Sequence, residues 1–224
     1  MSEDKEPQPI WRQQSPIDLV LGTSLPTTFA RDYLVIGYPN ADLPGRFKSH
    51  NFYFDAPPPL TFNGQEASLE RLHIHSPSEH RLDGKASDFE IHFVNPLKDS
   101  SGDSKAVVIG VFFKERRGAA TPPSIRALDE ALKARATTRA GAGTGGEVSG
   151  SVNPSDFLPV NRGQFFRYEG SLTTGDFDQV ISWFVLPHLV FVSPKDVAEL
   201  KKHAHEPARE VQALDRRFVL RNFT

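Results

Sequence analysis

Short strand-forming segments broken by turn residues dominate this sequence and limit what it can fold into. Runs of β-branched and aromatic residues alternate with Gly, Pro, Asn and Asp, a pattern typical of antiparallel strands joined by tight connections. The clearest segments are residues 33–38, 51–54, 69–75, 89–94, 106–113 and 180–186. They predict an α+β fold dominated by one large, twisted, mostly antiparallel β-sheet.

Helix signals are few, so helices are expected at the periphery. Residues 124–135 follow two prolines with a Ser cap and repeat Ile and Leu at helical spacing. A shorter helix is expected from Ser193, where Ser-Pro-Lys-Asp supplies a cap, a first-turn proline and an acid. Residues 139–151 contain five glycines and predict a surface loop.

The chain length favours one domain. The 224 residues suit a single β-rich core, so we expect a domain over 13–224 preceded by an N-terminal extension, 1–12. Residues 1–8 are charged and contain no apolar stretch, which predicts a soluble chain, cytoplasmic if this N-terminus is native and periplasmic or secreted if a signal peptide was removed.

Charge and cysteine content exclude several classes of function. The formal net charge of −2 gives no reason to expect nucleic acid or an anionic membrane as partner, and a small neutral substrate fits better. Because the chain has no cysteine, any bound metal must be held by His, Asp or Glu.

Three histidines on two neighbouring strand segments are the strongest chemical signal. His73 and His75 are two residues apart in a predicted strand, so both side chains leave the same face. His92, on the next segment, can reach that face from an antiparallel neighbour. Three imidazoles with one open position are typical of a catalytic zinc site. A lone His-x-His is more often accidental, and His203 and His205 have the same spacing in a polar setting that predicts solvated surface.

Longer motifs around these histidines resemble those of the alpha-class carbonic anhydrases. His-Ile-His-Ser-Pro-Ser-Glu-His at 73–80, followed by Glu-Ile-His at 90–92, resembles the zinc-binding signature of that family. Gln-Ser-Pro-Ile-Asp at 14–18 resembles its N-terminal motif, and Tyr-Glu-Gly-Ser-Leu-Thr-Thr at 168–174 its active-site loop. Further motifs that resemble the family lie at 183–186 and between Gln212 and Phe223, so the resemblance spans most of the chain.

The resemblance implies a zinc enzyme that reversibly hydrates carbon dioxide to bicarbonate and a proton. Zinc held by the three histidines would lower the pKa of a bound water to about 7, a value known for carbonic anhydrases as a class, and zinc-bound hydroxide would attack carbon dioxide. Thr173 matches the threonine that accepts from this hydroxide and donates to a glutamate, here Glu79. Outside this context, Thr173 would be interpreted as a strand residue and Glu79 as a solvated turn acid.

Supporting residues are implied in the same way. Glu90 lies two positions before His92 on the same face, where its carboxylate could accept the ring proton. His80 and Tyr168 match positions that support Glu79. The family's apolar substrate wall matches residues that would also be ordinary core: Val94, Val108, Leu172, Thr174, Ile181 and Trp183. His50 resembles the position of the proton shuttle, and an exposed loop histidine is the alternative interpretation.

Two departures from the family pattern affect the expected site. Gly175 and Asp176 stand where prolines are usual, which could loosen the loop carrying Thr173. Arg71 occupies the place of a glutamine that accepts a proton from the first zinc histidine, and arginine has no acceptor. We hypothesise that Arg71 pairs instead with a nearby carboxylate.

The family resemblance also implies ligands and leaves alternatives. Sulfonamide-type and anionic inhibitors are expected to bind, and the chain is expected to be a monomer or a homodimer. A catalytically silent binding protein of the same fold is one alternative, disfavoured because the zinc ligands, Glu79 and Thr173 are all present. A zinc esterase would use the same hydroxide and is expected at most as a side activity.

Overall fold

The computed structural model describes residues 13–99, 101, 104–139, 147–203 and 208–224. Its main element is a ten-stranded sheet with the strand order β12-β4-β5-β8-β10-β11-β14-β13-β15-β2. In chain order these strands are β2 (Leu25–Pro26), β4 (Leu43–Lys48), β5 (Asn51–Phe54), β8 (Arg71–His75), β10 (Phe89–Pro96), β11 (Ala106–Glu115), β12 (Val148–Val152), β13 (Phe166–Gly170), β14 (Ile181–Val192) and β15 (Leu220–Arg221). The expected large β-sheet is confirmed.

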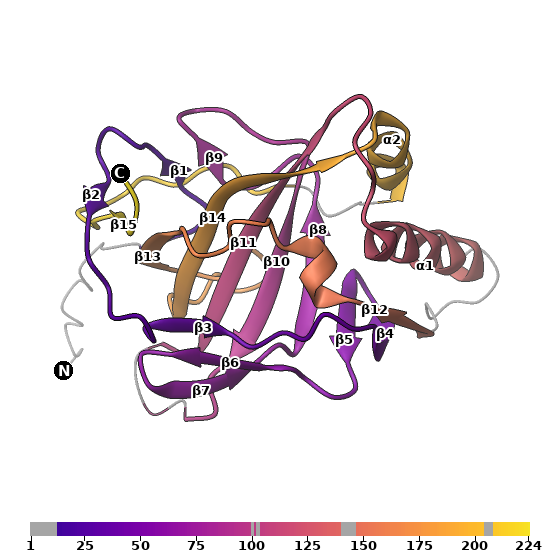
Figure 1. Cartoon of the computed structure of the whole chain (residues 1–224), viewed down its shortest axis with the longest axis horizontal. Helices are drawn as coiled ribbons and strands as arrows, with labels where there is room; N and C mark the ends of the chain where they lie inside the picture. Colours follow the sequence, from indigo (N-terminus) through magenta and orange to yellow (C-terminus); the bar gives the residue numbers. More distant parts are fainter. Residues whose placement is uncertain (1–12, 100, 102–103, 140–146, 204–207) are drawn as a thin grey trace, which may run out of the picture.

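Strand direction in this sheet is mostly antiparallel, as expected. In the described part of the chain, the exceptions are β11 with β14 and β15 with β2, which pair in parallel. The β11–β14 pair lies inside the sheet, and the long connection from β11 to β14 contains the helix of residues 123–139 as well as β12 and β13 (Figure 1). A parallel neighbour requires such a crossover, which strand periodicity alone does not reveal.

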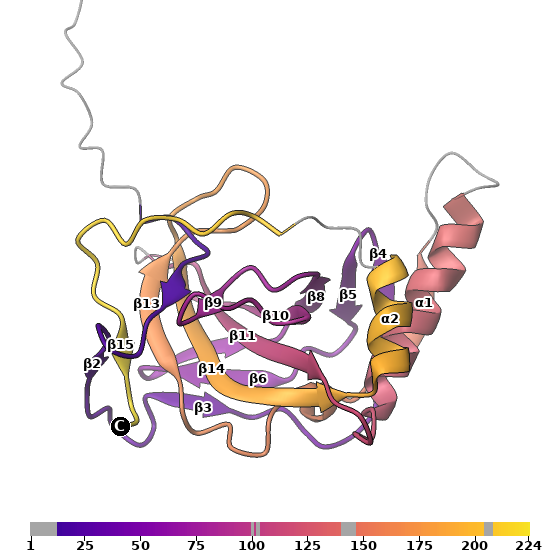
Figure 2. The same cartoon turned by 90° about the horizontal axis from the view of Figure 1, so that it is seen from above.

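Smaller elements cover the sheet. A three-stranded sheet of β3 (Leu34–Ile36), β6 (Pro59–Phe62) and β7 (Gln65–Ser68) lies against one face, and β1 (Asp18–Leu19) pairs with β9 (Arg81–Leu82) on the other side (Figure 2). The helices α1 (Pro123–Arg139) and α2 (Pro194–His203) lie side by side, with α1 against β12 and α2 next to β11, and η1 (Pro154–Phe157) is a single 3-10 turn. No helix in the described ranges is long and apolar enough to cross a membrane.

Both predicted helices form. α1 begins at Pro123 and ends four residues beyond the predicted end, and α2 begins at Pro194 with Ser193 as its cap, whose Oγ accepts the backbone N–H of Asp196 at 3.2 Å. The predicted loop at 139–151 is wrong in its last part, because residues 148–151 belong to β12 and pair with β4. Residues 1–12 and the His203–His205 prediction lie outside the residues whose side chains the structure describes.

The sheet separates two apolar cores through the alternation of its strands. Phe89, Ile91 and Phe93 of β10 point into the larger core, with Leu72 and Ile74 of β8. The intervening side chains of both strands leave the opposite face, where a smaller core includes Val94, Val108, Tyr168 and Trp183. The period of two therefore delivers every second residue of β8 and β10 to the face that carries the candidate site.

Candidate active site

The three predicted metal ligands meet on one face of the sheet. His73 lies directly opposite His92 in the register of β8 and β10, and His75 lies two residues further along β8. The ring centroids are 4.9 Å apart for His73 and His75, 5.2 Å for His73 and His92, and 4.8 Å for His75 and His92. One ring nitrogen from each residue lies within 4.8 Å of the others, so the cluster could hold a single metal ion.

Burial lowers the pKa of His73 and of His75, so these two imidazoles are neutral at neutral pH. His75 and His92 are buried, and His73 is partly exposed. Desolvation, reinforced by the neighbouring His92, lowers the pKa of His75 to about 3. Desolvation also lowers the pKa of His73 well below its usual range, and the charges of His75, His92 and Arg71 act in the same direction. Neutral rings are the protonation state that a metal ligand needs.

Glu90 joins the histidine cluster to the turn after β8. Its Oε1 lies 3.1 Å from His92 Nε2 and 2.8 Å from His80 Nδ1, while Oε2 accepts the backbone N–H groups of Glu79 at 3.0 Å and His80 at 2.9 Å. Burial raises the pKa of Glu90, but the interactions with His80 and His92 outweigh it and hold the pKa well below its usual range. The carboxylate is therefore charged and orients His92.

Glu79 and Thr173 lie beside the histidines. Glu79 Oε2 is 3.4 Å from His75 Nε2 and 3.8 Å from His92 Nδ1, and Oε1 accepts the backbone N–H of Arg209 at 2.9 Å. The Thr173 hydroxyl hydrogen-bonds the Glu79 side chain. Burial raises the pKa of Glu79, opposed by His92, Thr173 and Arg209. The structure thus brings the predicted pair together with the histidine cluster.

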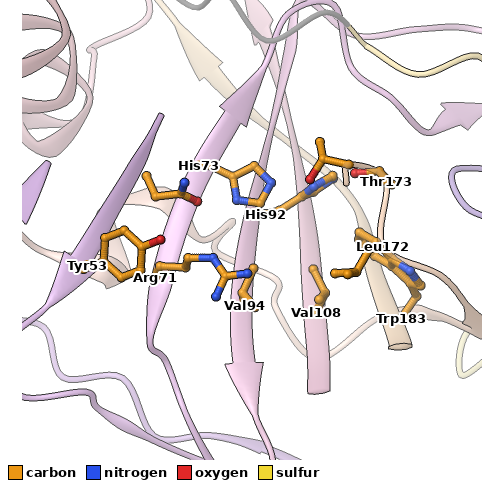
Figure 3. Close-up of a pocket in the computed structure, with 11 residues that line it drawn as sticks. Tyr53, Arg71, His73, His92, Val94, Val108, Leu172, Thr173 and Trp183 are labelled. Carbon is orange, nitrogen blue, oxygen red and sulfur yellow. The ribbon is translucent and has the colours of Figure 1, made fainter. Parts of the chain in front are cut away.

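A cavity of about 170 Å³ is lined by His73 and His92 together with nine further residues (Figure 3). Val94, Val108 and Trp183 form a row across β10, β11 and β14, because Val94 is opposite Val108 and Val108 is opposite Trp183. Leu172, Thr173 and Thr174 reach the cavity from the loop after β13. Of the predicted substrate wall, Ile181 does not line the cavity and is buried in the smaller core.

His80, the residue after Glu79, and Tyr168 are both buried and contact each other. His80 Nε2 is 2.6 Å from the Tyr168 hydroxyl, which lies 2.9 Å from Ser15 Oγ. Ser15 also accepts the backbone N–H of Ser171 at 3.1 Å, so this chain of contacts ties the N-terminal motif to the loop that carries Thr173.

The loop that carries Thr173 is held by contacts of its own, although it has no prolines. Gly175 has a φ of 70°, the left-handed conformation that glycine adopts without strain. The backbone N–H of Leu172 donates to the Asp178 carbonyl at 2.9 Å, and the Arg209 guanidinium lies 3.7 Å above the Phe177 ring. Cation–π stacking therefore holds one side of the loop.

Arg71 and His50 lie at the edges of the site. Arg71 lines the cavity, and its Nη1 donates to Glu70 Oε2 at 2.5 Å, which confirms the hypothesis of a carboxylate partner. His50 lies in the turn between β4 and β5, next to the lining residue Asn51, and its charge acts on His75. His50 is not among the residues that line the cavity.

Sequence reasoning missed four contributors. Asn51 and Tyr53 line the cavity from β5, and Arg209 binds Glu79 from 130 residues further along the chain. Gly110 lies opposite His92, and a Cβ there would stand 2.6 Å from Glu90 Oε1. A glycine inside a strand of β-branched residues was the available signal of a close approach.

A large sheet that carries a histidine cluster able to hold a metal ion at the base of a cavity is the architecture of a metal-dependent enzyme. The chain matches the eukaryotic-type carbonic anhydrase family over residues 3–223. It therefore belongs to the alpha carbonic anhydrase family.

Individual relatives agree with this assignment. A carbonic anhydrase of Nostoc sp. is 32% identical over 94% of this chain and 76% of its own length. Dioscorin dioA3 of Dioscorea japonica is 30% identical over 66% of this chain. The matched region covers 51% of the length of that dioscorin. Among solved structures, the alpha carbonic anhydrase of Thermovibrio ammonificans in complex with sulfanilamide has a TM-score of 0.76 at 26% identity, covering 93% of this chain and 86% of its own.

Proposed function

We propose that this chain is a zinc-dependent carbonic anhydrase that interconverts carbon dioxide and bicarbonate with release of a proton. The observation that carries the proposal is the placement of three imidazoles, two of them buried and one partly exposed, beside a cavity with one apolar wall and with the Thr173–Glu79 pair next to them.

The donor set fits zinc. Three imidazole nitrogens from His73, His75 and His92 would hold the ion, and three protein ligands leave a position for water or substrate. When bound, zinc acts as a Lewis acid that lowers the pKa of a coordinated water to about 7, as is known for carbonic anhydrases in general. The buried Glu90 carboxylate would fix the ring orientation of His92.

Thr173 orients the reacting oxygen. With its single hydroxyl proton donated to Glu79, the Thr173 oxygen would act only as an acceptor toward the cavity. A nucleophilic water or hydroxide must then direct its O–H at Thr173 and its lone pair at the substrate carbon. Glu79 is itself held by the Arg209 backbone N–H, so the orientation is set by a fixed chain of hydrogen bonds.

The apolar wall suits carbon dioxide. Val94, Val108, Leu172 and Trp183 offer no polar group that the substrate would have to displace, and they line the cavity next to His92. Carbon dioxide has no net dipole, so it prefers such a surface to one that binds water strongly. Thr174 adds a hydroxyl at the edge of the same wall.

His50 is proposed to move the released proton to buffer. An imidazole can take up and release protons at neutral pH. His50→Ala should therefore slow turnover in dilute buffer, and added imidazole should restore the rate. If the variant keeps full activity in dilute buffer, or if imidazole fails to restore its rate, His50 is a surface residue without a role in proton transfer.

Stopped-flow measurement of carbon dioxide hydration tests the main proposal, on zinc-loaded and chelator-stripped protein. We expect one zinc per chain by elemental analysis and activity only with the metal.

His92→Ala should lose both zinc and hydration, because two histidines cannot replace the three-ligand site. His188→Ala is the matched control, since His188 lies on β14 and contacts Gln164 at 2.7 Å. Zinc retained at full stoichiometry in His92→Ala would remove His92 from the ligand set.

A further inference from the structure

The cavity has a charged side as well as an apolar one. Arg71 is the one lining residue among those described that carries a permanent positive charge. It leaves the same face of β8 as His73, and 25% of its side chain is exposed. Arg71 is opposite Val94 in the register of β8 and β10, and Figure 3 shows its guanidinium beside Val94, at one end of the row of apolar side chains. A ligand that fills this cavity therefore meets a cation next to the apolar surface.

Arg71 keeps unused hydrogen-bond donors. Its Nη1 donates to Glu70 Oε2, and within the described residues no second acceptor of Arg71 is found. Glu70 is the more exposed partner, with 43% of its side chain accessible, so the pair is open at the cavity edge. A guanidinium offers five N–H groups in a planar fork, and one carboxylate contact leaves room for another oxyanion.

Two neutral polar residues flank this cation. Tyr53 is opposite Arg71 in the register of β5 and β8, and Asn51 is opposite His73. Both line the cavity, and Figure 3 shows Tyr53 next to Arg71. A phenol and an amide supply hydrogen-bond donors without adding negative charge. The wall formed by β5 and β8 thus favours an anionic group, whereas Val108, Leu172 and Trp183 favour an apolar one.

We propose that Arg71, with Tyr53 and Asn51 beside it, forms a subsite for the carboxylate group of a ligand whose other end lies at the histidine cluster. The subsite rests on the proposed function, because it acts on ligands anchored at that cluster. Arginine and carboxylate match in shape and charge, and their hydrogen bonds are charge-assisted. Since Arg71 is partly exposed and already shares its charge with Glu70, we expect about a fivefold gain in affinity, in the range of an exposed ion pair.

Two matched probes isolate the carboxylate contribution. 4-Sulfamoylbenzoate and 4-sulfamoylbenzamide share the ring and the sulfonamide that would bind zinc, and differ in the negative charge at the opposite end. The measurement is the ratio of their dissociation constants on the zinc-loaded full chain at low ionic strength. We expect the benzoate to bind about fivefold more tightly, and added salt to reduce this preference.

Neighbouring charge-neutralising variants should change the preference in opposite directions. Arg71→Gln should abolish it, whereas Glu70→Gln should increase it by releasing the guanidinium. Arg31→Gln, an exposed arginine before β3, should leave the ratio unchanged. Binding of the benzamide shows in each case that the variant is folded and zinc-loaded.

If both probes bind and the ratio of their dissociation constants is the same in the natural chain and in Arg71→Gln, the subsite is overturned and the proposed function is not. An equal loss in Arg31→Gln would also overturn it, because the preference would then come from overall charge. If neither probe binds a zinc-loaded chain, the proposed function fails together with the subsite.

Discussion

The Glu90 carboxylate illustrates how much of the site depends on single atoms. Oε1 contacts two imidazoles and Oε2 accepts two backbone N–H groups, so one buried residue orients His92 and fixes the turn that carries Glu79. A buried acceptor with four contacts is costly to disturb, because each lost partner leaves a polar group unsatisfied.

Thr173→Val should slow carbon dioxide hydration by about 100-fold while zinc content stays unchanged. The substitution keeps the shape of the side chain and removes the hydroxyl that orients the reacting oxygen. A rate loss of about 100-fold is typical when a contact that positions the reacting group is lost. Stopped-flow rates at saturating buffer, with zinc measured on the same sample, check this. Thr61→Val, in β6 of the small sheet, is the control. A rate within a few-fold of the natural protein would remove Thr173 from the mechanism.

At the scale of the elements, the site depends on how closely β10 and β11 approach. Gly110 is opposite His92, and the absent side chain makes the space into which the Glu90 carboxylate turns. Strands on either side are filled with large apolar residues, so an alanine at this position has little room to move away. The glycine thus acts as a positioning residue for Glu90 and, through it, for His92.

Gly110→Ala should weaken zinc binding by about 10–100-fold, the usual effect of losing a residue that orients a metal ligand. The new Cβ would lie 2.6 Å from Glu90 Oε1 and 3.5 Å from Val185. Chelator competition at fixed pH measures the affinity. Gly150→Ala in β12 is the matched control, because its Cβ would meet Phe47 at 3.6 Å, an ordinary contact. Unchanged zinc affinity in a folded Gly110→Ala protein would contradict the assignment.

At the scale of the whole molecule, the ten-stranded sheet separates a large apolar core from a smaller one, and the histidine cluster leaves the sheet on the face of the smaller core. His75 and His73 are neutral in the folded chain and become protonated below about pH 6.5 once the chain unfolds. Because the unfolded state then binds more protons, acidification destabilises the metal-free fold. Glu90, with its lowered pKa, acts in the same direction, and Glu79, with its raised pKa, acts against it.

Chelator-stripped protein should therefore lose stability as the pH falls from about 6.5 toward the His75 pKa of about 3. Each depressed histidine contributes a slope of up to about 1.4 kcal/mol per pH unit. Urea unfolding at several pH values between these limits gives the slope. His75→Leu should reduce it, and His188→Ala should not. Stability that stays constant or rises on acidification would contradict the neutral, desolvated state of these histidines.

Local patterns in the sequence were sufficient for a large part of this protein. Alternation along residues 69–75 and 89–94 placed the three histidines and Glu90 on one face, because side-chain direction in a strand depends only on position. Motif resemblance added Thr173, Glu79 and most of the cavity wall, and the structure brings these residues together. The same local rules predicted α1 and α2 close to their observed starts.

Tertiary structure alone decided the remainder, because register and crossovers join residues that are distant in the chain. The pairing of β5 with β8 brings Asn51 and Tyr53 into the cavity, and packing in the smaller core keeps Ile181 out of it. The return of the C-terminal segment delivers the Arg209 amide to Glu79. Periodicity is a property of one strand, whereas these contacts depend on which strands become neighbours and in what register.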